Sequence, residues 1–124
     1  MKASELRIGN MIYVERFGIN IVATIESGYD IDEVGHTKLS SQGIPLTEEW
    51  LMKFGFEQRS GITIWMKTIQ YHDENYPVTL QFTNNGTAMQ IARSGIGSAC
   101  APCKYVHQLQ NLYYSLTGEE LPCL

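Results

Sequence analysis

The sequence lacks any long apolar run. No stretch approaches the roughly 18 to 20 consecutive apolar residues that a membrane-spanning helix needs. The first ten residues carry Lys2, Glu5 and Arg7 in place of the apolar centre of a secretory signal. We therefore expect a cytoplasmic protein that does not associate with membranes.

Cationic side chains are also scarce. The 124 residues include nine Lys and Arg against thirteen Asp and Glu, which gives a net charge of −4. A protein that gains affinity by neutralising phosphates needs the opposite balance, and so does one that binds anionic lipid. The charge therefore disfavours nucleic acid as a partner. Arg7, Arg16, Lys38 and Lys53 are too dispersed in the sequence to indicate a local basic patch.

Recognisable catalytic motifs are missing as well. His36, His72 and His107 lie outside any nucleophile signature. The adjacent carboxylates at 48–49, 73–74 and 119–120 each have a local explanation as a helix cap or a solvated turn. The sequence therefore predicts a protein that is not an enzyme.

The composition that remains is typical of one globular domain. Hydrophobic residues make up 44% of the chain and charged residues 18%, and there is no internal repeat or linker-like tract. A chain of this length buries roughly two-thirds of its unfolded surface, so it can form a core without metals or disulfides. We expect a single domain spanning residues 1–124.

The first forty residues favour a hairpin followed by an irregular segment. Residues 11–16 read as a strand, and residues 19–26 alternate with Ile19 and Ile21 on one face, so the two strands should pair around Phe17-Gly18. Residues 27–30 carry a turn signal, and residues 31–39 read as a weak, acidic strand or loop.

A short central helix is predicted over residues 47–54. Thr47 is a good N-cap, and Glu48 and Glu49 lie at the positive end of the helix dipole. At the other end Gly55 can adopt a left-handed conformation, and Phe56 can fold back on the helix in a Schellman ending.

The second half predicts a meander and a last helix. Residues 62–71 alternate as a strand, and two further alternating runs flank Asn84-Asn85-Gly86, a strong hairpin signal. Gly95, Gly97 and Pro102 indicate a loop. Apolar residues recur at helical spacing over 104–116, and Gly118 supplies the stop.

These elements together predict an α+β fold with an antiparallel sheet. The sheet would comprise an N-terminal hairpin unit, for which a small SH3-like barrel is one form, and a meander over residues 56–93. The short central helix and the C-terminal helix would complete the domain.

Cysteines at 100, 103 and 123 raise two alternative functions. Cys100 and Cys103 enclose an Ala-Pro pair just before a helix, which is the spacing of a dithiol redox motif. Alternatively, Cys100, Cys103, His107 and Cys123 could supply four ligands to a zinc ion. Both alternatives have a simpler counterpart, in which the thiols stay reduced, His107 is an exposed or partly packed residue of the helix, and Cys123 is a free thiol near the end of the sequence.

A contact face is the preferred interpretation of the charge-poor second half. Residues 75–118 contain two cationic side chains, Arg93 and Lys104, and no anionic one. The centres of protein interfaces share this depletion of charge and enrichment in aromatic residues. On the last helix the candidate contact residues are Tyr105, Gln108, Asn111 and Tyr114. They predict a non-catalytic module that binds a protein partner or a second copy of itself, although the same residues could simply cover the sheet.

Three blocks of sequence carry a resemblance to a known family. They are residues 3–10 (ASELRIGN), 44–56 (IPLTEEWLMKFGF) and 104–121, which begins KYVHQLQNLY and ends LTGEEL. In these blocks the chain resembles small uncharacterised proteins found in prophages and mobile elements of gut anaerobic bacteria. The resemblance implies a phage or mobile-element context and carries over no catalytic residue. The family pattern does not include the Cys100-Cys103 pair.

Overall fold

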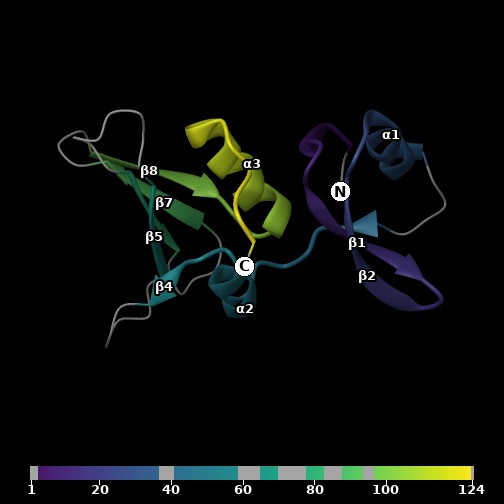
Figure 1. Ribbon diagram of the computed structural model, residues 1–124, viewed down its shortest axis with the longest axis horizontal. Helices are drawn as coiled ribbons and strands as arrows, with labels where there is room; N and C mark the ends of the chain where they lie inside the picture. Colours follow the sequence, from purple (N-terminus) through teal and green to yellow (C-terminus); the bar gives the residue numbers. More distant parts are fainter. Residues whose placement is uncertain are drawn as a thin grey trace.

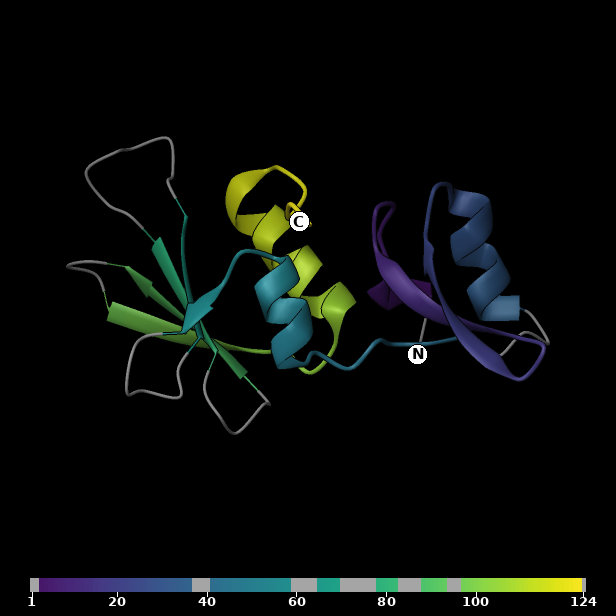
Figure 2. The same cartoon turned by 60° about the horizontal axis from the view of Figure 1, so that its bottom comes forward.

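The computed structural model describes residues 3–36, 41–58, 65–69, 78–82, 88–93 and 97–123. Within these ranges the chain forms two antiparallel sheets, three α-helices and a short 3-10 helix, which confirms the α+β class. The sheets lie at opposite ends of the molecule, with helices α2 (Glu48–Lys53) and α3 (Val106–Thr117) between them (Figure 1, Figure 2). None of the described helices has the length and apolar character needed to cross a bilayer.

The N-terminal unit is built around the predicted hairpin. Its elements in chain order are η1 (Ala3–Glu5), β1 (Met11–Arg16), β2 (Ile19–Thr24), α1 (Gly28–His36) and β3 (Ser41–Gln42). β1 and β2 pair without interruption, from Met11 opposite Thr24 to Arg16 opposite Ile19. The strand order β2-β1-β3 leaves β2 and β3 at the edges, so the described strands form an open sheet and not an SH3-like barrel.

Over residues 28–36, helix α1 corrects the prediction of a turn and an acidic strand or loop, and the rest of that prediction, residues 37–39, lies outside the described residues. The Asp30 carboxylate accepts the backbone N–H groups of Glu26 at 2.9 Å and Ser27 at 3.2 Å, just ahead of the helix. An acidic residue in the first turn also complements the helix dipole. In the sequence, Ile31 and Val34 are three residues apart. This spacing is compatible with a helix, so the pattern alone did not distinguish a helix from an irregular strand.

Helix α2 confirms the central helix, and its C-terminus confirms the Schellman ending. Gly55 has a φ of +83°, its N–H donates to Met52 O at 3.0 Å, and the Phe56 N–H donates to Leu51 O at 2.9 Å. The N-terminus differs from expectation in one respect. Thr47 has the extended backbone of an N-cap, but its hydroxyl makes no capping hydrogen bond.

The second sheet confirms the meander and extends it by one strand. Its five strands are consecutive in space, in the order β4 (Glu57–Gln58), β5 (Trp65–Ile69), β6 (Val78–Phe82), β7 (Ala88–Arg93) and β8 (Gly97–Pro102). Phe82 pairs with Met89 across the β6–β7 hairpin. The Asn84-Asn85-Gly86 turn itself lies outside the described residues.

Over residues 97–102, strand β8 corrects the prediction of a loop, and Gly95 lies outside the described residues. It pairs with β7 along its whole length, from Ala88 opposite Pro102 to Arg93 opposite Gly97. Small residues give no alternation that a sequence pattern could detect, so pairing to a neighbouring strand decides their conformation. Pro102 is the last residue of an edge strand, and edge strands are where proline is tolerated in sheets.

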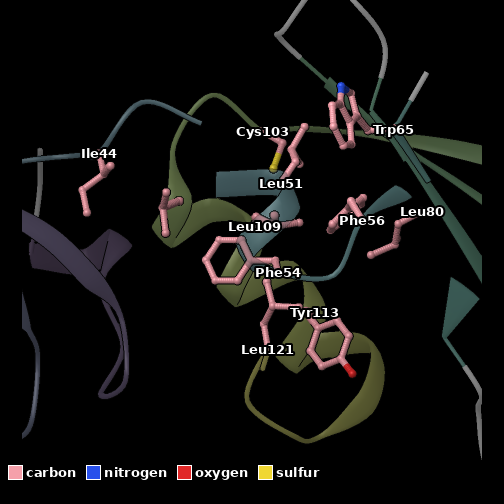
Figure 3. Close-up of a cluster of buried hydrophobic side chains, with 11 residues drawn as sticks. Ile44, Leu51, Phe54, Phe56, Trp65, Leu80, Cys103, Leu109, Tyr113 and Leu121 are labelled. Atoms are coloured by element: carbon pink, nitrogen blue, oxygen red, sulfur yellow. The ribbon is translucent and has the colours of Figure 1, made fainter. Parts of the chain in front are cut away.

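Helix α3 confirms the helix predicted over residues 104–116, and it packs on the main core. The helix ends at Gly118, whose φ is +73°. The main core is formed between the five-stranded sheet, α2 and α3 (Figure 3). Its largest buried side chains include Leu51, Phe54, Leu80 and Leu109. Met11 and Tyr13 of β1 pack against this core from the N-terminal unit.

Candidate functional site

The four residues predicted as a contact face are partly engaged within the chain. The Gln108 side chain caps its own helix, with Oε1 accepting the N–H groups of Lys104 at 2.7 Å and Tyr105 at 3.2 Å. Tyr105 stacks on His107 with ring centroids 5.7 Å apart. The role of this face in binding another polypeptide stays a prediction.

Asn111 and Tyr114 contact the N-terminal unit of the same chain. Asn111 Oδ1 accepts from Asn10 Nδ2 at 2.8 Å and Arg7 Nε at 3.3 Å, and Asn111 Nδ2 donates to Glu5 O at 2.9 Å. The Arg7 guanidinium lies 4.1 Å from the centre of the Tyr114 ring. The face of α3 that carries these two residues is therefore a junction inside the molecule.

Sequence reasoning missed the residues at the centre of this junction. Gln110 is 3% exposed, and its Oε1 accepts the Met11 N–H at 2.8 Å while its Nε2 donates to Gly9 O at 3.2 Å. Asn10 is fully buried beside it and accepts the Arg7 N–H at 2.7 Å. The Arg7 side chain also pairs with both carboxylate oxygens of Glu120. Gln110 lies among polar residues of α3, and such a group is typical of a solvated helix face. No sequence signal therefore marked it as buried.

The structure does not support the dithiol alternative at Cys103. This thiol is fully buried in the main core, and its burial raises its pKa to about 12 (Figure 3). A redox thiol needs a lowered pKa and access to solvent. Cys100 lies in β8 and not in a loop before the helix, and its side chain is outside the described residues.

The described residues hold no assembled ligand set for the zinc alternative, and the Cys100 side chain lies outside them. His107 is buried on α3, whereas Cys123 is exposed near the C-terminus. Among the described residues no three His, Cys, Asp or Glu side chains converge on a common point.

The buried Cys103 thiol leads to a prediction on reactivity. In a Cys100→Ser, Cys123→Ser variant, we expect the remaining thiol to react with a disulfide reagent about 100-fold more slowly in the folded state than in urea, because reaction requires local opening. Absorbance of the released thiolate measures this rate. A variant that instead retains Cys123 is the matched control and should react rapidly without denaturant. Rapid reaction of Cys103 in the folded protein would contradict its burial.

His107 is a buried base at the edge of the junction. Its side chain is 1% exposed, and neither ring nitrogen has a hydrogen-bond partner in the described part of the chain. Burial lowers the pKa of His107 below 6.5, the carboxylate of Glu5 at 3.8 Å opposes this shift, and the N-terminal amine adds to it. Burial of the ring without a hydrogen-bond partner among the described residues favours a neutral imidazole in the folded protein.

This lowered pKa predicts that stability falls as the solution is acidified. Below about pH 6.5 the unfolded chain takes up a proton that the folded chain resists, so the free energy of unfolding decreases by at most about 1.4 kcal/mol per pH unit from this group. Urea unfolding at pH 7.5, 6.5 and 5.5 measures the slope. A His107→Gln variant should show a shallower slope, and identical slopes would contradict the assignment.

An open groove lies where the C-terminus of α2 faces β5. It has a volume of about 420 Å³ and is lined by Gly55, Glu57, Gln58, Met66, Lys67 and Thr68. Lys67 Nζ donates to Phe54 O at 2.7 Å, and burial lowers the pKa of Lys67. The lysine therefore caps the Phe54 carbonyl at the C-terminus of α2, which explains its position without a ligand.

Among the described residues, the most exposed apolar side chain lies at the tip of the β1–β2 hairpin. Phe17 is 102% exposed, and Ile19, Ile21 and Val22 on β2 are also exposed. Both turn residues have positive φ, +55° at Phe17 and +77° at Gly18, as in a type I′ turn. Asn-Gly is the usual pair in such a turn, so a phenylalanine there is the signal that sequence analysis could have used.

No protein-family model, no curated protein and no solved structure matches this chain. The exposed surface of the molecule is therefore the remaining guide to its function.

Proposed function

We propose that this chain is a non-catalytic protein-binding module that acts in the cytoplasm, in a phage or mobile-element context. Its contact surface is the β1–β2 hairpin tip, defined by Phe17, Ile19, Ile21 and Val22. The resemblance of the three sequence blocks supports the context. The observation that carries the proposal is Phe17, a fully exposed aromatic side chain on a backbone that phenylalanine disfavours.

Phe17 contributes little to the fold that holds it. Its ring is exposed to the same extent as in an extended chain, so it makes no packing contact that stabilises this molecule. A left-handed conformation costs a non-glycine residue about 1–2 kcal/mol. Strained residues of this kind concentrate at binding sites, where a partner supplies the compensating contacts. Burying the ring in a partner would contribute about 1.5–3 kcal/mol.

The residues around Phe17 have the composition of a small interface. Ile19 and Ile21 share one face of β2, and Val22 lies on the other. A central aromatic anchor with an apolar surround is the usual arrangement of an interaction hot spot. Glu15 is exposed on the neighbouring strand and provides a polar border. We therefore expect the partner to offer an apolar pocket for the ring.

Photo-crosslinking from the tip tests this proposal. A benzophenone amino acid is placed at position 17 and, as a matched control, at position 52, where Met52 is exposed on α2 away from the hairpin. We expect irradiation in the native host to yield a discrete adduct from position 17 and not from position 52. Mass spectrometry then identifies the attached protein.

A purified pair completes the test. The identified protein is titrated with the wild-type chain and with Phe17→Asn in a calorimeter, and we expect the substitution to weaken binding by at least about 30-fold, as for a hot-spot residue. Equal affinities, or equal adducts from positions 17 and 52, would refute the hairpin tip as the contact surface.

A further inference from the structure

Among the sheet edges that the structure describes, one lacks the protection that the others have. β3 and β4 are edges of two residues each, β4 includes Glu57, and the β8 edge ends in Pro102. Short length, charge and proline are the devices by which proteins keep an edge from pairing with another strand. β2 has six residues, Ile19–Thr24, without a charged residue or proline. Among the described strands, its edge is the one best suited to accept another strand.

The register of the hairpin shows which backbone groups of β2 point outward. The Ile25 N–H donates to Asn10 O at 2.8 Å, and Ile19 closes the two-residue turn opposite Arg16. Odd-numbered residues of β2 therefore bond to β1. Because the direction of the backbone groups alternates along a strand, the N–H and C=O groups of Asn20, Val22 and Thr24 face away from the sheet. No bulge interrupts this row.

We propose that β2 pairs antiparallel with β2 of a second copy of this chain, with Val22 on the two-fold axis. The inference rests on the proposed role of the hairpin as the binding element. It identifies a second copy of the chain as the partner of the β2 edge. Phe17 lies in the turn beyond the paired residues. Each copy therefore keeps its own Phe17 at the tip.

The symmetric register follows from the three outward residues. Centring the pair on Val22 places Asn20 opposite Thr24 of the second copy, so all three outward residues exchange hydrogen bonds. A shift by one residue would set outward groups against groups already bonded to β1. A shift by two in one direction would leave Thr24 opposite a turn glycine, and in the other it would set Glu26 opposite Asn20.

Side-chain chemistry supports the same register. It sets an amide opposite a hydroxyl at each Asn20–Thr24 contact, and Ile21 opposite Ala23 of the second copy on the other face. Val22 meets Val22 at the axis. Such β-branched and polar pairs stabilise antiparallel strands, whereas like charges opposite each other destabilise them. β2 is therefore complementary to itself, and an isologous pair closes both edges at once.

A charge exchange at the axis tests the dimer. Val22 is 44% exposed, so a charged residue at this position is compatible with the monomer. We expect the wild type to sediment as a dimer in the presence of reductant, which excludes a disulfide through Cys123. Val22→Lys and Val22→Glu should each raise the dissociation constant about 100-fold or more, because two like charges meet at the axis. Mixing the two variants should restore dimers, and Val22→Thr should dimerise like the wild type.

Amide hydrogen exchange gives a test that needs no variant. In the dimer the N–H groups of Asn20, Val22 and Thr24 should be protected, and dilution should remove this protection. The N–H groups of Ile21 and Ala23, which bond to β1, should stay protected at every concentration. Amides at 20, 22 and 24 that exchange freely in concentrated solution would overturn the proposal.

Different results would refute the proposed dimer and the proposed hairpin-tip partner. A wild type that sediments as a monomer up to millimolar concentration overturns the β2 pairing, and so does a dimer that persists in both charged variants. Neither result removes the crosslink from position 17, which is scored in a chain that keeps Val22. Conversely, Phe17→Asn should leave the dimer intact, because it changes no residue of the paired strand.

Discussion

Replacing Gln110 with leucine is expected to lower the free energy of unfolding by about 2–4 kcal/mol. Leucine fills nearly the same volume, but it leaves the Met11 N–H and the Gly9 carbonyl without their partners in a buried junction. Each unsatisfied buried group costs about 1–3 kcal/mol. Urea unfolding measures the loss, and exchange of the Met11 amide should accelerate with it.

Gln108→Leu is the matched control on the same helix. Gln108 is only partly buried, and it caps backbone groups near solvent. Removing a cap of this kind costs about 1 kcal/mol. If both substitutions cost the same, the buried amide at 110 would not be the centre of the junction.

Phe17→Asn is expected to have effects of opposite sign on stability and on binding. Asparagine tolerates the left-handed conformation better than phenylalanine, and Asn-Gly is the preferred pair of a type I′ turn. The fold should therefore gain about 1 kcal/mol, which raises the melting temperature by about 3–5 °C for a chain of this length. Partner capture through the hairpin tip should be lost in the same variant.

Calorimetric melting of the wild type and the variant measures the gain. Phe17→Ala is the companion variant, because it removes the ring without supplying a residue suited to positive φ. It should lose the partner with little gain in stability. A lower melting temperature for Phe17→Asn would show that the ring stabilises this fold, and it would remove the argument for a binding role.

Elements with a marked pattern or a specified end were predicted from the sequence. The β1–β2 hairpin followed from alternation, α2 from Gly55 and Phe56 at its end, and α3 from helical spacing up to Gly118. In each case the local signal and the tertiary contacts favour the same structure, which is why local reasoning succeeds there.

The elements that were missed depend on distant neighbours. β8 is a strand because β7 pairs with it, although its small residues show no alternation. α1 forms over residues whose acidic character suggested a loop, and Asp30 binds backbone groups at its start. The buried role of Gln110 depends on Met11, which lies 99 residues earlier in the chain. No window of local sequence contains such a contact.

The 99 residues that separate Met11 from Gln110 in the sequence also determine when this contact can form during translation. The N-terminal strands leave the ribosome long before α3 exists, so they wait for nearly the whole chain before the amides of Asn111 and Gln110 reach them. During that interval the uncharged edge of β2 is exposed on a nascent chain. A message truncated before residue 106 would therefore release a hairpin that lacks its closing helix and is prone to aggregate.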